Sequence, residues 1–176
     1  TEQLFNLVND VLDLSRMETG DLNFKLGDYP LIECCQSALD SICHRIPEGV
    51  ELTFTPDVIP VTLHTDTLRL QQILTNLLTN SAKFTKEGEI NLSYKVDKGG
   101  KQVYISVTDT GCGIPKEKQA AVFQRFEKLD DYKSGAGLGL SICTLIADRL
   151  GGILSIDPTY ENGARFVFTH PCEIPS

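Results

Sequence analysis

Hydrophobic residues recur at helical spacing in several segments of the chain. The pattern predicts helices over residues 1–18, 30–46, 68–85, 115–126 and 140–150. The first has so wide an apolar face that it is typical of a helix bundle. In the second, the apolar residues expected on the buried side are Ile32, Cys35, Leu39, Ile42 and Ile46. Asp66 or Thr65 is the expected N-cap of the third helix, and Gly151-Gly152 ends the last one.

Other segments alternate apolar and polar residues, as strands with one buried face do. They predict strands over residues 51–54, 89–96, 102–108, 153–156 and 164–169, while residues 22–29 are extended. Two of the connections, residues 97–100 and 161–163, are rich in Gly, Asp and Asn and indicate hairpins. Strands and helices do not alternate strictly, which predicts an α+β fold with helices on one face of a mixed sheet.

The predicted helix over residues 68–85 carries a polar stripe beside its apolar face. The residues expected on the apolar face are Leu70, Ile73, Leu77 and Phe84. The residues of the neighbouring polar stripe are Gln72, Asn76, Asn80 and Lys83. Asparagine is an indifferent helix former, so two of them one turn apart need a reason. Amide oxygens beside an ammonium group are suited to a cation and an anion held together.

Two glycine-containing segments are further candidates for ligand contact. Residues 109–115 (DTGCGIP) follow a strand and can present the Asp109 carboxylate to a ligand that approaches bare backbone, although a plain turn is the alternative. The same Asp-Thr-Gly triplet occurs in aspartic proteases, but that chemistry needs two carboxylates and hence a homodimer here. Residues 135–140 (GAGLGL) precede a helix and can cradle an anion, or form an ordinary flexible loop.

Length and composition narrow the function classes. The 176 residues, 41% of them hydrophobic, suit one domain with an extension, and the start at Thr1 suggests a piece of a longer protein. The net charge of −8 argues against a nucleic-acid or anionic-membrane surface. The six cysteines form no CxxC pair, which predicts reduced thiols rather than a zinc site or a disulfide framework.

The order and spacing of four segments resemble the sensor histidine kinases of two-component systems. The Asn-bearing helix, the strand followed by Asp-x-Gly-x-Gly, residues 123–126 (FQRF) and the Gly-rich helix start are similar to the N, G1, F and G2 boxes of that family. It belongs to the GHKL ATPase superfamily with DNA gyrase and MutL-type ATPases. The resemblance implies a two-layer α/β sandwich, a mixed sheet covered on one face by three helices. Residues 1–20 look like the end of the dimerization helix with its linker, and residues 21–176 like the catalytic ATP-binding domain.

The resemblance also implies a set of nucleotide contacts. The residues matched to them are Asn76, Asn80, Lys83, Phe84, Asp109, Gly111, Gly113, Ile114, Phe126, Gly135, Ala136, Gly137, Leu138, Gly139 and Leu140. Residues 115–136 would form the mobile ATP lid. Gly111 and Gly113 would admit the base, and Asp109 would accept the adenine amine.

The matched catalytic residues are Asn80, Lys83 and Lys128. Asn80 would bind Mg²⁺ through its amide oxygen, a hard ligand for a hard cation. Lys83 would neutralise phosphate charge, and Lys128 would lie near the γ-phosphate. Two residues depart from the family pattern, because Ala136 and Ala164 stand where hydroxyl residues are common, which predicts the loss of hydrogen bonds to nucleotide or water.

The implied reaction is transfer of the ATP γ-phosphoryl group to a histidine. The family's phosphoacceptor box is absent, and His44, His64 and His170 lie in the wrong surroundings. The acceptor would therefore belong to the dimerization helix bundle of the same parent protein, expected to be a homodimer that acts on a downstream response regulator receiver domain. The expected location is a cytoplasmic domain of a membrane-anchored sensor. The alternatives are a nucleotide-binding regulatory module without turnover, and a GHKL serine kinase, which the segment 1–20 argues against.

Overall fold

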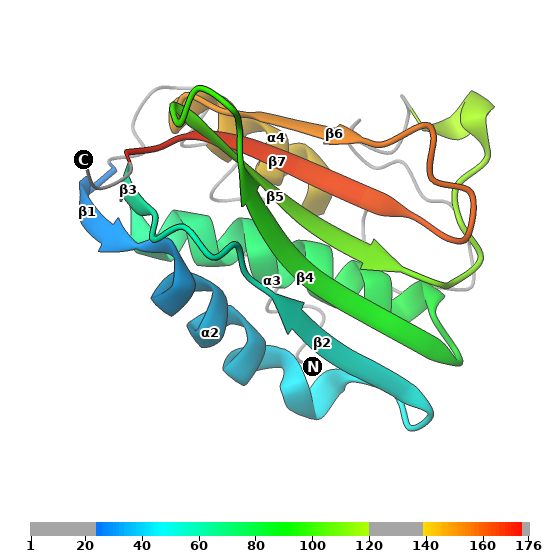
Figure 1. Cartoon of the computed structure of the whole chain (residues 1–176). Coiled ribbons are helices and arrows are strands. Elements are labelled where there is room, and N and C mark those ends of the chain that lie inside the picture. The colour runs from blue at the N-terminus through cyan, green and yellow to red at the C-terminus, as the bar shows by residue number, and fades with distance from the viewer. Residues whose placement is uncertain (1–23, 120–138, 174–176) are drawn as a thin grey trace.

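The computed structural model describes residues 24–119 and 139–173, arranged as a sheet with helices packed against it (Figure 1). The strands are β1 (Gly27–Pro30), β2 (Val50–Thr55), β3 (Thr62–Thr65), β4 (Gly88–Val96), β5 (Gln102–Asp109), β6 (Ile153–Ile156) and β7 (Arg165–Pro171). The α-helices are α2 (Leu31–Ile42), α3 (Thr67–Phe84) and α4 (Gly139–Arg149). Two short 3₁₀ turns, η1 (Cys43–Arg45) and η2 (Lys116–Lys118), complete the described elements.

The main sheet has five strands in the order β2-β4-β5-β7-β6. Strand β2 runs parallel to β4 and the other pairs are antiparallel, so the sheet is mixed. Strands β1 and β3 form a separate antiparallel pair beside it. Helices α2, α3 and α4 lie together on one face of the main sheet, and no described helix covers the other face, the uncovered face (Figure 1). This arrangement confirms the predicted two-layer α/β sandwich.

The core lies between the helices and the alternate residues of the central strands. On α3, Leu70, Ile73 and Leu77 are fully buried, as the periodicity predicts, whereas Phe84 is only half-buried. Phe166 and Phe168 of β7 fill the opposite side of this core. Full burial of one such side chain contributes about 1.5–3 kcal/mol relative to exposure. The same alternation leaves polar residues of β4, β5 and β7 on the uncovered face.

Several predicted elements differ from the structure. The predicted helix over residues 30–46 is α-helical only to Ile42 and continues as η1 to Arg45. Ile32 is 44% exposed, because the buried stripe starts at Leu31 and the next residue is turned by about 100° from it. The short strand β3 was not predicted, since it has only four residues and forms its ladder with β1.

Two of the predicted helices lie wholly or largely outside the described residues. The helix over residues 1–18 lies outside the described residues. Of the helix over residues 115–126, the described part contains only the 3₁₀ turn Lys116–Lys118. None of the helices in residues 24–119 and 139–173 combines the length and apolarity needed to cross a membrane.

All six cysteines are free. Burial raises the pKa of Cys35 to about 12, followed by a smaller effect of neighbouring Cys34. A thiol held protonated in this way is a poor nucleophile and a poor metal ligand. Within the described residues no group of three or more His, Cys, Asp or Glu could hold a metal ion.

Candidate nucleotide-binding site

Helix α3 is fixed at its start by the side chain of Asp66. Its Oδ1 accepts the Arg69 N–H at 3.2 Å, which confirms Asp66 as the N-cap. Its Oδ2 accepts the Lys25 N–H at 2.8 Å. One carboxylate thus joins the start of α3 to the chain that precedes β1.

One residue of the polar stripe of α3, Asn76, contacts α4. Asn76 and Asn80 are half-buried and Lys83 is exposed. The Asn76 Nδ2 donates to Sγ of the buried Cys143 on α4 at 3.3 Å, which leaves the Asn76 amide oxygen turned to other partners. Within the described part of the chain, no hydrogen bond involves the Asn80 side chain. The stripe therefore offers amide oxygens, the hard ligands that Mg²⁺ prefers.

Asp109, the last residue of β5, is held by backbone groups and is only 3% exposed. Its Oδ1 accepts the N–H of Gly111 at 3.0 Å and the N–H of Ala164 at 3.1 Å. Its own N–H donates to the Ala164 carbonyl at 2.9 Å. Among the described residues no hydrogen bond reaches Oδ2. The carboxylate is thus an oriented acceptor with one oxygen left for a donor from outside.

The loop after Asp109 packs directly on the C-terminal end of α3. A Cβ on Gly111 would lie 2.3 Å from the Phe84 carbonyl oxygen, and the Cys112 N–H donates to the same oxygen at 3.2 Å. Gly113 has φ +75°, and a Cβ there would lie 3.1 Å from the Gly163 carbonyl oxygen. These contacts bring Asp109 next to the last turn of the helix that carries Asn80.

The two glycines therefore have partners that the sequence did not suggest. The resemblance implies that Gly111 and Gly113 admit a base. In the structure, both glycines lie in close contact with protein backbone. Glycine is required at these positions for the loop to approach α3 and the β6–β7 connection.

Two buried hydroxyl groups near the same place have no protein partner. Ser81 and Thr85 are 0% and 1% exposed, and neither side-chain oxygen has a hydrogen bond in the described structure. Ser81 lies in the last turn of α3 and Thr85 is its C-cap. A buried hydroxyl without a partner costs about 1–3 kcal/mol, so a bound ligand or water is the expected partner. Neither residue is among the predicted site residues. The one signal in the sequence is that Ser81 interrupts the apolar stripe at i+4 from Leu77.

The structure brings together one part of the predicted site. Of the predicted residues, Phe84 at the end of α3 meets Gly111 of the loop after Asp109, and Ile114 and Leu140 pack at the margin of the core. Gly139 and Leu140 open α4, as predicted for the last Gly-rich residues. The predicted site residues outside the described residues are Phe126, Lys128, Gly135, Ala136, Gly137 and Leu138.

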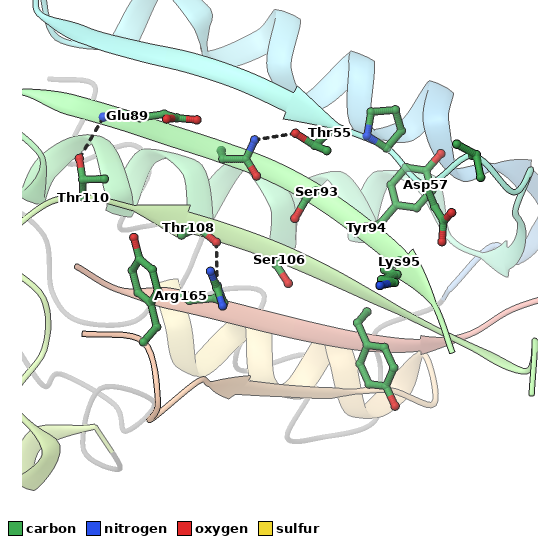
Figure 2. A pocket seen from close by; sticks show the side chains of 15 residues that line it. Thr55, Asp57, Glu89, Ser93, Tyr94, Lys95, Ser106, Thr108, Thr110 and Arg165 are labelled. Atoms are coloured by element: carbon green, nitrogen blue, oxygen red, sulfur yellow. Dashed lines mark hydrogen bonds between the residues drawn. The ribbon is translucent and has the colours of Figure 1, made fainter. Parts of the chain in front are cut away.

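A separate groove of about 710 Å³ lies on the uncovered face of the sheet (Figure 2). Its floor is formed by small polar side chains of β4 and β5, among them Asn91, Ser93 and Ser106. It contains none of the predicted site residues. Because Asp109 and the α3 stripe face the helix side of the sheet, the groove and the candidate nucleotide site lie on opposite faces.

Comparison with known proteins identifies one family. Residues 65–174 match the family described as histidine kinase-, DNA gyrase B-, and HSP90-like ATPase. The sensor protein TorS of Escherichia coli (strain K12) is 36% identical over 98% of the chain. Hybrid signal transduction histidine kinase B of Dictyostelium discoideum is 33% identical over 98% of the chain. The chain spans only 19% and 9% of these two proteins.

Solved structures with a similar fold are consistent with the family of these relatives. Full-length ShkA, crystallised in complex with AMPPNP, superposes with a TM-score of 0.87 at 31% identity, over 98% of this chain and 36% of that one. The nucleotide-free catalytic domain of histidine kinase ThkA superposes with a TM-score of 0.72 at 27% identity, over 84% of this chain and 96% of that domain.

Proposed function

Because the chain belongs to the histidine kinase-, DNA gyrase B-, and HSP90-like ATPases, and among them to the histidine kinase catalytic domains, we propose that it binds Mg²⁺-ATP and transfers the γ-phosphoryl group to a histidine. The observation that carries this proposal is the geometry of Asp109. A buried carboxylate with one oxygen fixed by two backbone N–H groups and the other without a bond is suited to one donor of a flat ligand.

Base recognition follows from the chemistry of that carboxylate. An ionised carboxylate only accepts hydrogen bonds, so Asp109 pairs with the exocyclic amine of adenine and repels the carbonyl oxygen of guanine at the equivalent place. An acceptor left facing an acceptor costs about 1–3 kcal/mol, which corresponds to a roughly tenfold to hundredfold preference for ATP. The unpartnered hydroxyls of Ser81 and Thr85 offer further polar contacts beside it.

The α3 stripe fits a magnesium ion that is shared with phosphate. Asn80 would hold Mg²⁺ through its amide oxygen, which has no competing hydrogen bond in the described structure, and Asn76 would support it from one turn away. One or two amide oxygens are a partial shell, which water and phosphate oxygens must complete. When bound, the ion offsets the negative charge that the phosphates carry. Lys83, exposed one turn after Asn80, would contact phosphate.

The reaction is an in-line displacement. A histidine ring nitrogen attacks the γ-phosphorus, the new P–N bond forms as the bond to the β–γ bridging oxygen breaks, and ADP leaves. The protein's part is to align the reactants and to stabilise charge, which Lys83, Lys128 and Gly135–Gly139 would do along the triphosphate. We further propose that the acceptor histidine is supplied by a helix bundle of the same, homodimeric parent, and that a receiver domain takes the phosphoryl group next. The domain would work in the cytoplasm.

Phosphoryl transfer is tested by incubating the chain with γ-labelled ATP, Mg²⁺ and the histidine-bearing segment of the parent protein. The expected product is labelled acceptor whose phosphoryl bond is labile to acid and stable to alkali, as a P–N bond is. ATP binding without any label on the acceptor would contradict the kinase proposal and identify a regulatory nucleotide-binding module. An acid-stable label on serine would identify a serine kinase.

A further inference from the structure

The β6–β7 connection, residues 157–164, contacts the carboxylate that the proposed function assigns to the base. The Ala164 N–H occupies Oδ1 of Asp109 at 3.1 Å. Gly163 packs so closely that an added Cβ would lie 2.0 Å from the Asp109 carbonyl oxygen and 2.9 Å from its Oδ1. The orientation of Asp109 therefore depends on where this connection lies, as well as on the loop that follows β5.

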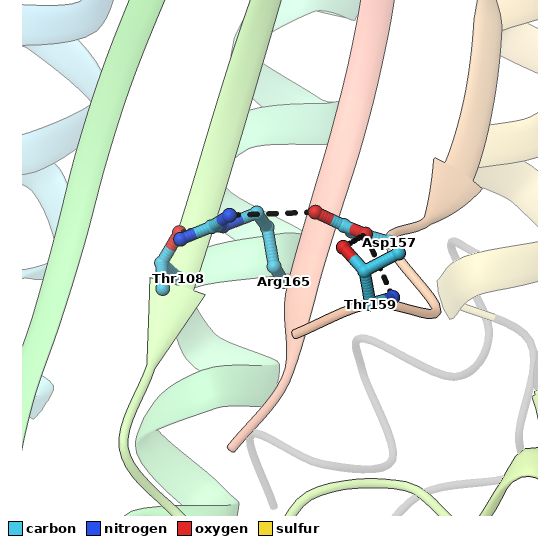
Figure 3. A network of polar contacts seen from close by, with 4 residues as sticks. All are labelled: Thr108, Asp157, Thr159 and Arg165. Carbon is cyan, nitrogen blue, oxygen red and sulfur yellow. Dashed lines mark hydrogen bonds and ion pairs between the residues drawn. The ribbon is translucent and has the colours of Figure 1, made fainter. Parts of the chain in front are cut away.

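One side chain, Arg165, ties this connection to the sheet (Figure 3). Its Nε donates to Thr108 Oγ1 at 3.1 Å, and its Nη1 donates to Asp157 Oδ2 at 3.3 Å. Its guanidinium carbon lies 4.4 Å from the centroid of the Tyr160 ring, which belongs to the connection. Arg165 thus contacts the residue before Asp109, the beginning of the connection and its middle.

Asp157 is itself oriented to receive Arg165. Its Oδ1 accepts the hydroxyl of Thr159 at 2.6 Å and the N–H of Thr159 at 2.9 Å. Both bonds lower the pKa of Asp157, and the bond from the hydroxyl has the larger effect. The carboxylate is therefore charged at neutral pH. The Asp157 N–H also donates to the Arg165 carbonyl at 2.9 Å. The start of the connection is therefore held to β7 by backbone and side chain together.

Arg165 acts from the face of the sheet that the nucleotide does not occupy. Arg165 and Thr108 are register partners on β7 and β5 and both line the groove of the uncovered face (Figure 2). Successive strand residues point to opposite faces, so Asp109, next to Thr108, points to the helix side, where it is buried. An influence of Arg165 on a base therefore passes through the backbone, either that of residues 163 and 164 or that of Thr108, which precedes Asp109.

We propose that Arg165 is a positioning residue for base selection, an inference that rests on the proposed ATP site. By joining Asp157 to Thr108, it holds the β6–β7 connection where the Ala164 N–H occupies Oδ1 of Asp109. Oδ2 then stays turned toward the exocyclic amine of adenine. Without Arg165, the connection can shift, the Ala164 bond lengthens, and the carboxylate rotates between orientations, so the amine loses its fixed partner.

The experiment separates this role from that of an ordinary surface ion pair, which contributes little to anything measured. The 176-residue chain is titrated with ATP and with purine riboside triphosphate, which lacks the 6-amino group. The variant is Arg165→Met, and the matched control is Lys95→Met, which removes another cation that lines the same groove. The unmutated chain and the control are expected to prefer ATP by about tenfold, and Arg165→Met by about threefold or less.

A second variant and a double-mutant cycle complete the test. Thr108→Val removes one of the Arg165 bonds and is expected to reduce the preference in the same direction by a smaller factor. In an Asp109→Ala background, Arg165→Met should change ATP affinity no further, since the group it positions is gone.

The outcomes distinguish the inference from the function on which it rests. Equal loss of both nucleotides in Arg165→Met, or an unchanged preference in Arg165→Met and Thr108→Val, overturns the positioning role and leaves the ATP site standing. If Arg165→Met does not fold, Thr108→Val decides. If the unmutated chain binds neither nucleotide, the proposed function itself fails, and the inference with it.

Discussion

The base end and the phosphate end of the proposed ATP site are built from different kinds of contact. At the base end, Asp109 is fixed by two backbone N–H groups, and glycines on both neighbouring connections pack against backbone. At the phosphate end, Asn80 and Lys83 project from one helix, and the Asn80 side chain makes no hydrogen bond in the described structure. Folding alone completes the base end, whereas the phosphate end is completed only when a metal ion and phosphates bind.

This difference predicts how each end responds to substitution. A change at the base end removes contacts that the folded chain itself uses, so stability and binding should fall together. At the phosphate end, the Asn80 side chain makes no hydrogen bond in the described structure, so a change of Asn80 should reduce binding alone. A variant that shows the opposite combination of effects would contradict this difference between the two ends.

Gly163→Ala should have the largest effect on stability. Its Cβ would overlap the carbonyl oxygen of Asp109, which belongs to a paired strand and cannot move aside cheaply. We expect a loss of about 3 kcal/mol in the free energy of unfolding, measured by urea denaturation. The matched control is Gly99→Ala in the β4–β5 hairpin, where an added Cβ meets nothing closer than 4.0 Å. Similar losses in both variants would mean that the base end is not tightly packed.

Asp109→Ala should weaken ATP by about tenfold to hundredfold and reduce the preference for ATP over GTP. It should also destabilise the fold by roughly 1–3 kcal/mol, because the N–H groups of Gly111 and Ala164 lose their acceptor. Parallel nucleotide titration and urea denaturation measure both losses. A loss of binding with no loss of stability would contradict the assignment of the base end.

Asn80→Asp should change binding and leave stability within about 0.5 kcal/mol of the unmutated chain. The new carboxylate repels phosphate when little Mg²⁺ is present and attracts the ion more strongly than the amide does. ATP affinity should therefore become more steeply dependent on Mg²⁺ concentration, with a loss of about tenfold at low Mg²⁺. Titrations at several Mg²⁺ concentrations measure this. An unchanged affinity and an unchanged metal dependence would show that the polar stripe is not the phosphate end.

The smallest predicted effect concerns His170, which anchors the start of α3. Its Nδ1–H donates to the Pro171 carbonyl, and its Nε2 accepts from the hydroxyl of Thr65, next to the N-cap Asp66. Burial lowers the pKa of His170, so the folded chain binds its proton less readily than the unfolded chain does. Stability from this group is present above the unfolded pKa of about 6.5 and is lost as pH falls below it toward the lower folded pKa.

Urea denaturation at pH 7.5 and pH 5.5 measures whether the free energy of unfolding falls on acidification. The loss on acidification should be smaller in His170→Gln, because that variant has no imidazole to protonate in the unfolded state. An equal loss in both proteins would assign the pH dependence to other groups.

The sequence predicted the parts of the molecule that depend on local pattern. Helix α3 and its Asp66 cap follow from apolar periodicity and from a capping side chain at the right place. The two hairpins follow from alternation and turn residues. Ile32 was misplaced because a face through Ile32 also fits the apolar spacing, whereas the buried stripe starts at Leu31. Strand β3 was missed because it is short and, among the described strands, pairs in a ladder only with β1.

The tertiary contacts of the site could not be predicted in this way. Sequence analysis treats Ala164 as a missing hydroxyl, yet its backbone N–H binds Asp109, a role that no side chain reports. Gly111 is recognisable as a turn glycine, but its partner, the Phe84 carbonyl, lies on another element. Arg165 belongs to none of the sequence motifs. Its contacts with Asp157 and Thr108 form only when β5, β6 and β7 are paired.

We propose that this chain selects adenine with Asp109 and holds the phosphates with α3. The most direct measurement is calorimetric titration of the unmutated chain with ATP and with GTP, each with and without Mg²⁺. The account predicts binding of ATP that is about tenfold to hundredfold tighter than that of GTP and is strengthened by Mg²⁺. Equal affinities for ATP and GTP would remove Asp109 from the base pocket and contradict the account.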